Sequence, residues 1–117
     1  MTMNSPIKEK SFAFAVRIVK FARWLDEQGV NYKLTDQVLR SGTSIGANVI
    51  EAQAAQTKKD FAYKMQLSFK EANETRYWLE LLSASETISQ KVADDLIKDV
   101  TELIKLLATI IKSSKQK

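Results

Sequence analysis

The most informative segment of this 117-residue chain reads Arg40-Ser41-Gly42-Thr43-Ser44-Ile45-Gly46-Ala47-Asn48, followed directly by Val49-Ile50-Glu51-Ala52. Apolar and small residues recur through it at intervals of three and four, from Leu34 and Val38 to Ala52, which is the spacing of a helix. Each interior glycine costs a helix about 1 kcal/mol relative to alanine, so tertiary packing must compensate. Glycines four residues apart leave a groove in a helix surface, and we therefore expect close helix packing at Gly42 and Gly46.

Two other interpretations of the glycine pair do not fit the surrounding sequence. A phosphate-binding loop has a preceding strand and a Gly-Lys-Ser/Thr ending, and this segment has neither. A membrane Gly-x-x-x-Gly contact needs about 20 apolar residues around it, and Asp36, Arg40 and Glu51 interrupt such a run. A small-molecule pocket at the glycine groove is a third hypothesis beside the functions considered below.

Composition restricts both the fold and the chemistry. The chain is 44% apolar and 27% charged, with three glycines and a single proline, Pro6. This length fits one domain over residues 1–117, and the scarcity of glycine and proline predicts an all-α protein. Cysteine and histidine are absent, which removes disulfides, thiol chemistry, most zinc sites and the commonest general base. The sequence shows neither a signal-peptide pattern nor a membrane-spanning apolar run, so we expect a cytoplasmic protein without membrane contact.

Hydrophobic spacing predicts an up-down-up-down four-helix bundle with short connections. Its helices are expected at residues 6–28, 33–56, 58–85 and 90–112. Asn4 or Ser5 is the expected cap of the first helix, which Gly29 ends, and Asn31 and Thr57 are expected to cap the next two.

Two of these helices, 6–28 and 58–85, carry apolar side chains on two opposite faces, whereas the helix at 90–112 is apolar on one side only. A helix that is apolar on both sides must be covered on both. In a chain this short, a second subunit can cover the outer side. The expected subunit-contact residues are Phe12, Val16, Val19, Tyr63, Leu67, Trp78 and Leu81.

Arg76 lies near the inner apolar face of the helix at 58–85, where an unpaired guanidinium would be very costly. We therefore expect it to form a buried ion pair, either with Glu51 or with a glutamate of a neighbouring subunit.

Charge is unevenly distributed along the chain. Residues 1–64 carry ten basic and six acidic side chains, whereas residues 71–104 carry three basic and eight acidic ones. Such polarity suits nucleic-acid contact by the basic part, or subunits that meet with opposite charges. Solvated lysines and buried aromatic rings explain the same pattern without any ligand. The residues expected to neutralise phosphates are Arg17, Lys20, Arg23, Arg40, Lys58, Lys59 and Lys64.

The paired carboxylates do not amount to a catalytic or metal site. Glu71-x-x-Glu74 suggests a carboxylate-bridged metal centre, but such centres in four-helix bundles need Glu-x-x-His on two helices. Asp94 and Asp95 lie near the start of a helix, where acidic side chains stabilise its dipole. We therefore expect no catalytic residues, no metal and no cofactor.

Two segments carry a resemblance to a known family. They are residues 40–48 with Glu51-Ala52, and Asp60-Phe61 through Lys70-Glu71-Ala72-Asn73-Glu74-Thr75-Arg76-Tyr77-Trp78-Leu79. Together they are similar to the four-helix-bundle proteins encoded in bacterial 23S rRNA intervening sequences, and the similarity covers nearly the whole chain. The resemblance implies an antiparallel four-helix bundle that assembles as a ring, commonly a homopentamer, with no catalytic residues to transfer. More distantly, the chain is similar to the accessory protein of diversity-generating retroelements, which binds a reverse transcriptase and nucleic acid through a basic surface.

The sequence thus predicts a cytoplasmic, non-enzymatic oligomer that binds RNA or another nucleic acid through its basic half. The alternative is an assembly or adaptor protein whose partner is another protein and which has no nucleic-acid role. Salt-dependent binding of ribosomal RNA fragments would separate the two.

Overall fold

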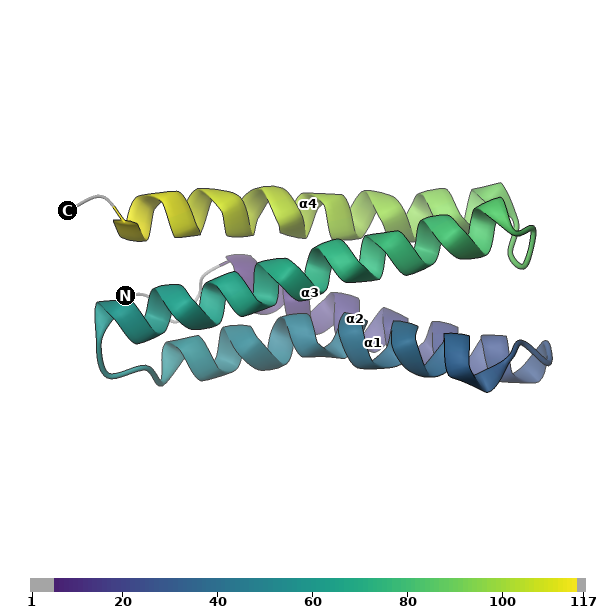
Figure 1. Ribbon diagram of the computed structural model, residues 1–117, viewed down its shortest axis with the longest axis horizontal. Coiled ribbons are helices and arrows are strands. Elements are labelled where there is room, and N and C mark those ends of the chain that lie inside the picture. The colour runs from purple at the N-terminus through teal and green to yellow at the C-terminus, as the bar shows by residue number, and fades with distance from the viewer. Residues whose placement is uncertain (1–5, 116–117) are drawn as a thin grey trace.

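The computed structural model describes residues 6–115, and these form four α-helices without a strand. The helices are α1 (Pro6–Glu27), α2 (Tyr32–Gln53), α3 (Lys58–Ala84) and α4 (Gln90–Lys115). The α1–α2 and α3–α4 turns lie at one end of the molecule and the α2–α3 turn at the other, so α1 begins near the end where α4 finishes (Figure 1). The molecule is a rod of 47 × 21 × 19 Å.

Each helix packs most closely on its neighbour in the sequence. α2 lies against both α1 and α3, and α3 also lies against α4. α1 meets α4 at far fewer points, and the described residues bring α1 and α3 into no substantial contact. The seam between α1 and α4 is therefore the loosest of the bundle.

The helices lie in the expected regions, but their ends differ. α1, α2 and α3 finish one to three residues earlier than expected, α2 begins one residue earlier, and α4 continues to Lys115. The last turn of α4 adds only polar residues, so hydrophobic spacing could not have located it. The expected cap of α1 at Asn4 or Ser5 lies outside the described residues.

Two side-chain caps begin helices as expected. The side chain of Asn31 accepts a hydrogen bond of 2.8 Å from the backbone N–H of Lys33, and the Thr57 hydroxyl accepts one of 3.0 Å from Asp60. Each bond satisfies a donor that has no partner within its own helix.

α1 and α3 end in the same backbone arrangement. At the end of α1, Gly29 has φ +77°, and the Val30 N–H donates to the carbonyl of Leu25 at 3.1 Å. At the end of α3, Glu86 has φ 62°, and the Thr87 N–H donates to the carbonyl of Leu82 at 2.9 Å. This left-handed position favours glycine, so Glu86 is strained where Gly29 is not.

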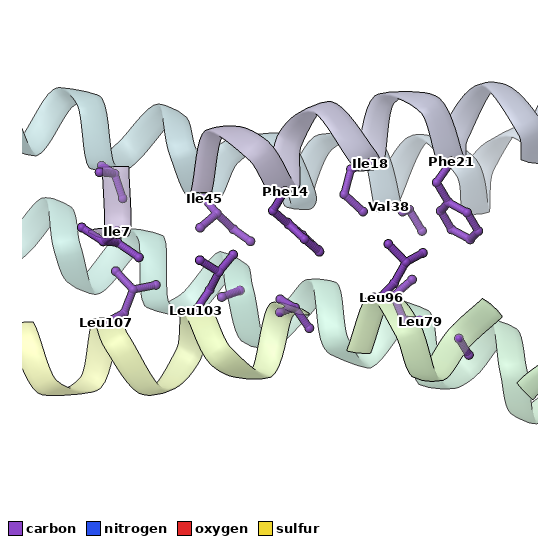
Figure 2. Close-up of a cluster of buried hydrophobic side chains, with 14 of the residues drawn as sticks. Ile7, Phe14, Ile18, Phe21, Val38, Ile45, Leu79, Leu96, Leu103 and Leu107 are labelled. Carbon is purple, nitrogen blue, oxygen red and sulfur yellow. The ribbon is translucent and has the colours of Figure 1, made fainter. Parts of the chain in front are cut away.

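A single core runs along the rod, and all four helices contribute side chains to it (Figure 2). Phe14, Ile45 and Leu103 point toward one another from α1, α2 and α4. The fully buried large side chains include Ile7, Ile18, Leu25, Val38, Ile45, Met65, Leu79 and Leu107. This core covers one face of α1 and α3 and leaves the other face outside.

Gly42 allows α1 to approach the backbone of α2. A Cβ atom at Gly42 would lie 2.8 Å from Cγ2 of Ile18, closer than carbon atoms can approach. A Cβ atom at Gly46 would meet the backbone oxygen of Ser11 at 3.4 Å, an ordinary contact distance. Of the two glycines, Gly42 is the one that the close packing requires.

Small hydroxyl side chains allow α2 and α3 to approach each other closely as well. The buried Ser68 hydroxyl donates to the carbonyl of Ile45 at 2.8 Å, and the Thr75 hydroxyl donates to the hydroxyl oxygen of Ser41 at 2.9 Å. Both polar groups are therefore satisfied at a close helix contact.

Candidate functional site

The segments at 40–52 and 60–79 face each other across α2 and α3. The Arg40 guanidinium donates to Glu71 Oε1 at 3.1 Å and also pairs with Glu74. Glu74 accepts a second hydrogen bond, of 2.9 Å, from the indole Nε1 of Trp78. We refer to Arg40, Glu71, Glu74 and Trp78 as the Arg40 cluster. Because both carboxylates bond to the same guanidinium, the Glu71-x-x-Glu74 pair holds the Arg40 side chain in this fold.

Arg17, predicted to bind phosphate, is also neutralised within the chain. Its guanidinium lies in the seam between α1 and α4 and pairs with Asp95 and Asp99. Partial burial lowers the pKa of Arg17, but the hydrogen bonds to the two carboxylates outweigh that effect and leave it raised. Lys10 and Glu102 form a second ion pair across the same seam, at 3.0 Å.

Lys64 pairs with Glu51 across α2 and α3, with 2.6 Å between Nζ and Oε1. The hydrogen bond from Lys64 to Glu51 raises the pKa of the lysine above its ordinary value of 10.5. The stabilisation is complete below that ordinary value and is lost as the pH rises through the higher folded pKa. The charges of Arg17, Arg40 and Lys64 are thus neutralised by carboxylates of the same chain.

The other four predicted phosphate ligands remain available. Lys20, Arg23, Lys58 and Lys59 are exposed, and their side chains make no ion pair or hydrogen bond within residues 6–115. Lys20 and Arg23 lie toward the end of α1, whereas Lys58 and Lys59 begin α3 at the opposite end of the rod (Figure 1). One subunit does not bring the two pairs together.

The expected ion pair between Glu51 and Arg76 is wrong. Glu51 pairs with Lys64, and Arg76 is half-buried without an ion pair among the described residues. The cause is the register of α2 and α3. Thr75, beside Arg76, lies opposite Ser41, and Ser41 is ten residues, or about 15 Å of helix, from Glu51.

The predicted subunit-contact residues lie on two separate surfaces. On α1, Phe12 is 69% exposed, and Val16 and Val19 are also exposed. On α3, Tyr63 is 57% exposed. The other three predicted contacts, all on α3, are half-buried: Leu67, Trp78 and Leu81.

Two further exposed apolar residues belong to these surfaces and were not predicted. Ile50 of α2 is 51% exposed, and Tyr77 of α3 is 55% exposed. The signal for Ile50 was available, since it follows Gly46 by one helical turn. For Tyr77 the prediction chose its neighbour Trp78 instead; the two rings lie in contact, with a centroid distance of 5.1 Å.

A groove of about 610 Å³ runs between α1 and α2 where Gly46 leaves the helix surface low. Phe12 of α1 and Ile50 of α2 line its two sides. We call this the α1–α2 groove; its lining residues are Lys8, Glu9, Ser11, Phe12, Ala15, Thr43, Gly46, Ala47 and Ile50. The glycine pair therefore has two different functions, because Gly42 admits Ile18 and Gly46 opens an apolar surface.

Residues 6–115 contain no group of three acidic, histidine or cysteine side chains placed to hold a metal ion. Among the same residues, no helix combines the length and the apolar character needed to cross a bilayer.

Comparison with known proteins identifies what the chain resembles. The model of the 23S rRNA-intervening sequence protein family matches residues 3–109. A crystal structure of a protein of unknown function from the S23 ribosomal protein family of Bacteroides thetaiotaomicron is 48% identical, with a TM-score of 0.88. The alignment covers 91% of this chain and 98% of that one. No curated protein matches the sequence.

Proposed function

The chain belongs to the 23S rRNA-intervening sequence protein family, and on this basis we propose that it is a non-enzymatic homo-oligomer that binds RNA or another nucleic acid. We propose that the subunit is an antiparallel, up-down-up-down bundle and that its copies close into a ring in the cytoplasm. The family resemblance favours five copies.

The observation that carries the assembly is the exposure of large apolar side chains on α1 and α3. Phe12, Val16 and Val19 form one stripe, and Tyr63 and Tyr77 lie on another helix. Burying apolar surface stabilises by about 25 cal/mol per Å², so each covered ring is worth on the order of 1–2 kcal/mol. A second copy is the simplest source of that cover.

Two unlike apolar surfaces favour a ring over a symmetric dimer. In a two-fold dimer the same patch meets itself, which would leave the second surface of each copy exposed. If the α1 surface of one copy meets the α3 surface of the next, both are covered and the contacts repeat until the assembly closes.

The nucleic-acid part of the proposal rests on Lys20, Arg23, Lys58 and Lys59. Each subunit offers only two separated basic pairs, so we expect a single subunit to bind nucleic acid weakly. A ring repeats Lys58 and Lys59 once per copy, and phosphate contacts add in free energy.

Light scattering tests the assembly. We expect the wild-type mass to be a multiple of the subunit mass, and we expect Phe12→Ser to shift the distribution toward monomer. Because Phe12 is 69% exposed, this substitution should leave the helix content unchanged by circular dichroism. A wild-type protein that stays monomeric at every concentration would refute the proposal.

Fluorescence anisotropy with ribosomal RNA fragments at about 50 mM salt tests the nucleic-acid role. We expect Lys58→Gln with Lys59→Gln to weaken binding and to flatten its salt dependence by about two phosphate contacts. The matched control is Lys91→Gln with Lys98→Gln, two exposed lysines of α4. Equal losses in both variants would indicate non-specific attraction.

A second candidate function is a protein adaptor without a nucleic-acid role. The neutralisation of Arg17, Arg40 and Lys64 by carboxylates of the same chain favours it. Absence of RNA binding by an intact oligomer at about 50 mM salt would select this candidate.

A further inference from the structure

The contacts that α1 and α3 each make with α2 show which of their residues lie at the same height along the long axis of the rod. Ser11 lies beside Gly46, and Ser68 bonds to Ile45, the adjacent residue of α2. Ser68 therefore lies within one residue, or about 1.5 Å, of the level of Ser11, which is 57 positions earlier in the chain.

A second pair of contacts gives the same register further along. Ile18 packs on Gly42, and Thr75 bonds to Ser41, the adjacent residue of α2. Thr75 therefore lies within one residue of the level of Ile18, again 57 positions earlier. The constant offset holds because α1 and α3 both run from the end that carries the α2–α3 turn (Figure 1).

We propose that the exposed side of α1, with the α1–α2 groove, receives the outer side of α3 from a second copy, with Arg23 paired to Glu80 of that copy. This rests on the proposed assembly and specifies its contact. Rotation about a ring axis leaves every atom at its own height. Where the rods stand along that axis, residues of α1 therefore meet residues of α3 that are 57 positions later.

Charge complementarity supports the pairing. Arg23 and Glu80 are level, both are exposed, and neither side chain has an ion-pair partner within residues 6–115. Lys70, exposed and one position beyond the level of Phe12, can place its ammonium over that ring. Opposite charges thus meet at one height and a cation meets an aromatic face at another. In the assembled ring Arg23 therefore serves the subunit contact, and Lys58 and Lys59 are the basic pair left for phosphate.

Apolar side chains match in the same register. Lys20 is level with Tyr77, and the neighbouring Val19 offers that ring an apolar surface. The α1–α2 groove begins near Lys8 and extends past Phe12, and the outward-facing Leu67 of α3 is level with its middle. Apolar surface therefore meets apolar surface at both ends of the proposed contact, at Tyr77 and at Leu67.

Crosslinking between single-cysteine variants tests the contact, because the chain has no cysteine of its own. We expect a short bis-maleimide to join Val19→Cys to Tyr77→Cys when the two variants are assembled together, and to join neither variant to itself. The double variant should give a ladder of bands that ends at the number of copies in the ring. Self-crosslinking of Val19→Cys alone, or no crosslink in the mixture, would overturn the proposed pairing.

Charge reversal provides the second test. We expect Arg23→Glu and Glu80→Arg each to raise the subunit concentration at half-assembly by about 5-fold, and the double variant to return within about 2-fold of wild type. Lys98→Glu, the same kind of change at an exposed lysine of α4, is the matched control and should have no effect.

The outcomes separate this contact from the assembly itself. A wild-type protein that remains monomeric removes both proposals. A wild-type oligomer in which the double reversal is no better than either single one, or in which Lys98→Glu acts as strongly, removes only the pairing of α1 with α3.

Discussion

Glu86 adopts a left-handed backbone conformation that glycine reaches without a steric penalty, whereas a side chain makes it costly. Its N–H donates to the carbonyl of Ser83 at 2.9 Å, so the end of α3 holds the residue in this conformation. Gly29 occupies the equivalent position at the end of α1, where a Cβ atom would meet nothing within 4 Å. The two positions differ in side chain and share a backbone geometry.

We expect Glu86→Gly to raise the free energy of unfolding by about 0.5–1 kcal/mol, because it relieves this strain. Gly29→Ala should lower it by about 1 kcal/mol for the opposite reason. Urea denaturation at one subunit concentration measures both changes. Equal effects of the two substitutions would show that backbone conformation is not their cause.

Single residues also show what the sequence could and could not reveal. The caps at Asn31 and Thr57 follow from local residue preference, because each side chain bonds an amide only two or three positions away. The partner of Glu51 depends on how α2 and α3 are registered, which local sequence does not encode. For the same reason the sequence could not reveal that Arg17 faces the carboxylates of α4.

At the scale of helices, the glycine pair of α2 separates into two positions with different surroundings. Ile18 is fully buried and contacts Gly42, so an added methyl group at Gly42 has no space to enter. The nearest atom to a methyl group at Gly46 is at an ordinary distance.

We expect Gly42→Ala to destabilise the protein by about 1–2 kcal/mol, since overpacking outweighs the gain in helix propensity. Gly46→Ala should be neutral or stabilising by up to about 1 kcal/mol. Thermal or urea unfolding of the two variants provides the comparison. A more harmful change at Gly46 would contradict the packing described here.

Helical spacing identified the opposite apolar faces of α1 and α3 but not what would cover them. Phe12 and Val16 are exposed in the single subunit, whereas Leu67 and Trp78 are half-buried. For Trp78 the partial burial accompanies the hydrogen bond from its indole N–H to Glu74 within the Arg40 cluster. Spacing along one helix carries no information about contacts to the next.

At the scale of the whole molecule, the four helices are not equally bound to one another. α1 approaches α4 at few points, and two sets of ion pairs, Arg17 with Asp95 and Asp99 and Lys10 with Glu102, bridge the seam. Salt screens partly exposed ion pairs, both these and those of Arg40 and Lys64 across α2 and α3, whereas it does not screen apolar contacts.

We expect a rise from about 0.05 M to about 0.5 M NaCl to lower the free energy of unfolding by about 0.5 kcal/mol. Arg17→Met should remove part of this dependence, because the ion pairs of Lys10, Arg40 and Lys64 remain. Lys98→Met, which alters an exposed lysine of α4 without an ion pair among the described residues, should preserve all of it. Urea titrations at the two salt concentrations make the measurement. A salt response as large in Arg17→Met as in the wild type would place its origin elsewhere in the molecule.

The family, the all-α class and the presence of four helices could be predicted from the sequence, because each depends on spacing or on a local motif such as residues 40–52. The sequence could not show which basic residues form ion pairs and which remain unpaired. Three of the seven expected phosphate ligands bond to carboxylates at distant positions, and only the folded arrangement shows which ones.

The start of α1 and the end of α4 lie toward the same end of the rod (Figure 1). Rotation about an axis along the rods would give every copy the same orientation, so the ring would have two unlike openings. One would be surrounded by the α2–α3 turns together with the start of α1 and the end of α4, and the other by the two remaining turns of each copy. A passenger protein fused to either terminus would be displayed on the first opening alone, which makes the assembly a one-sided platform.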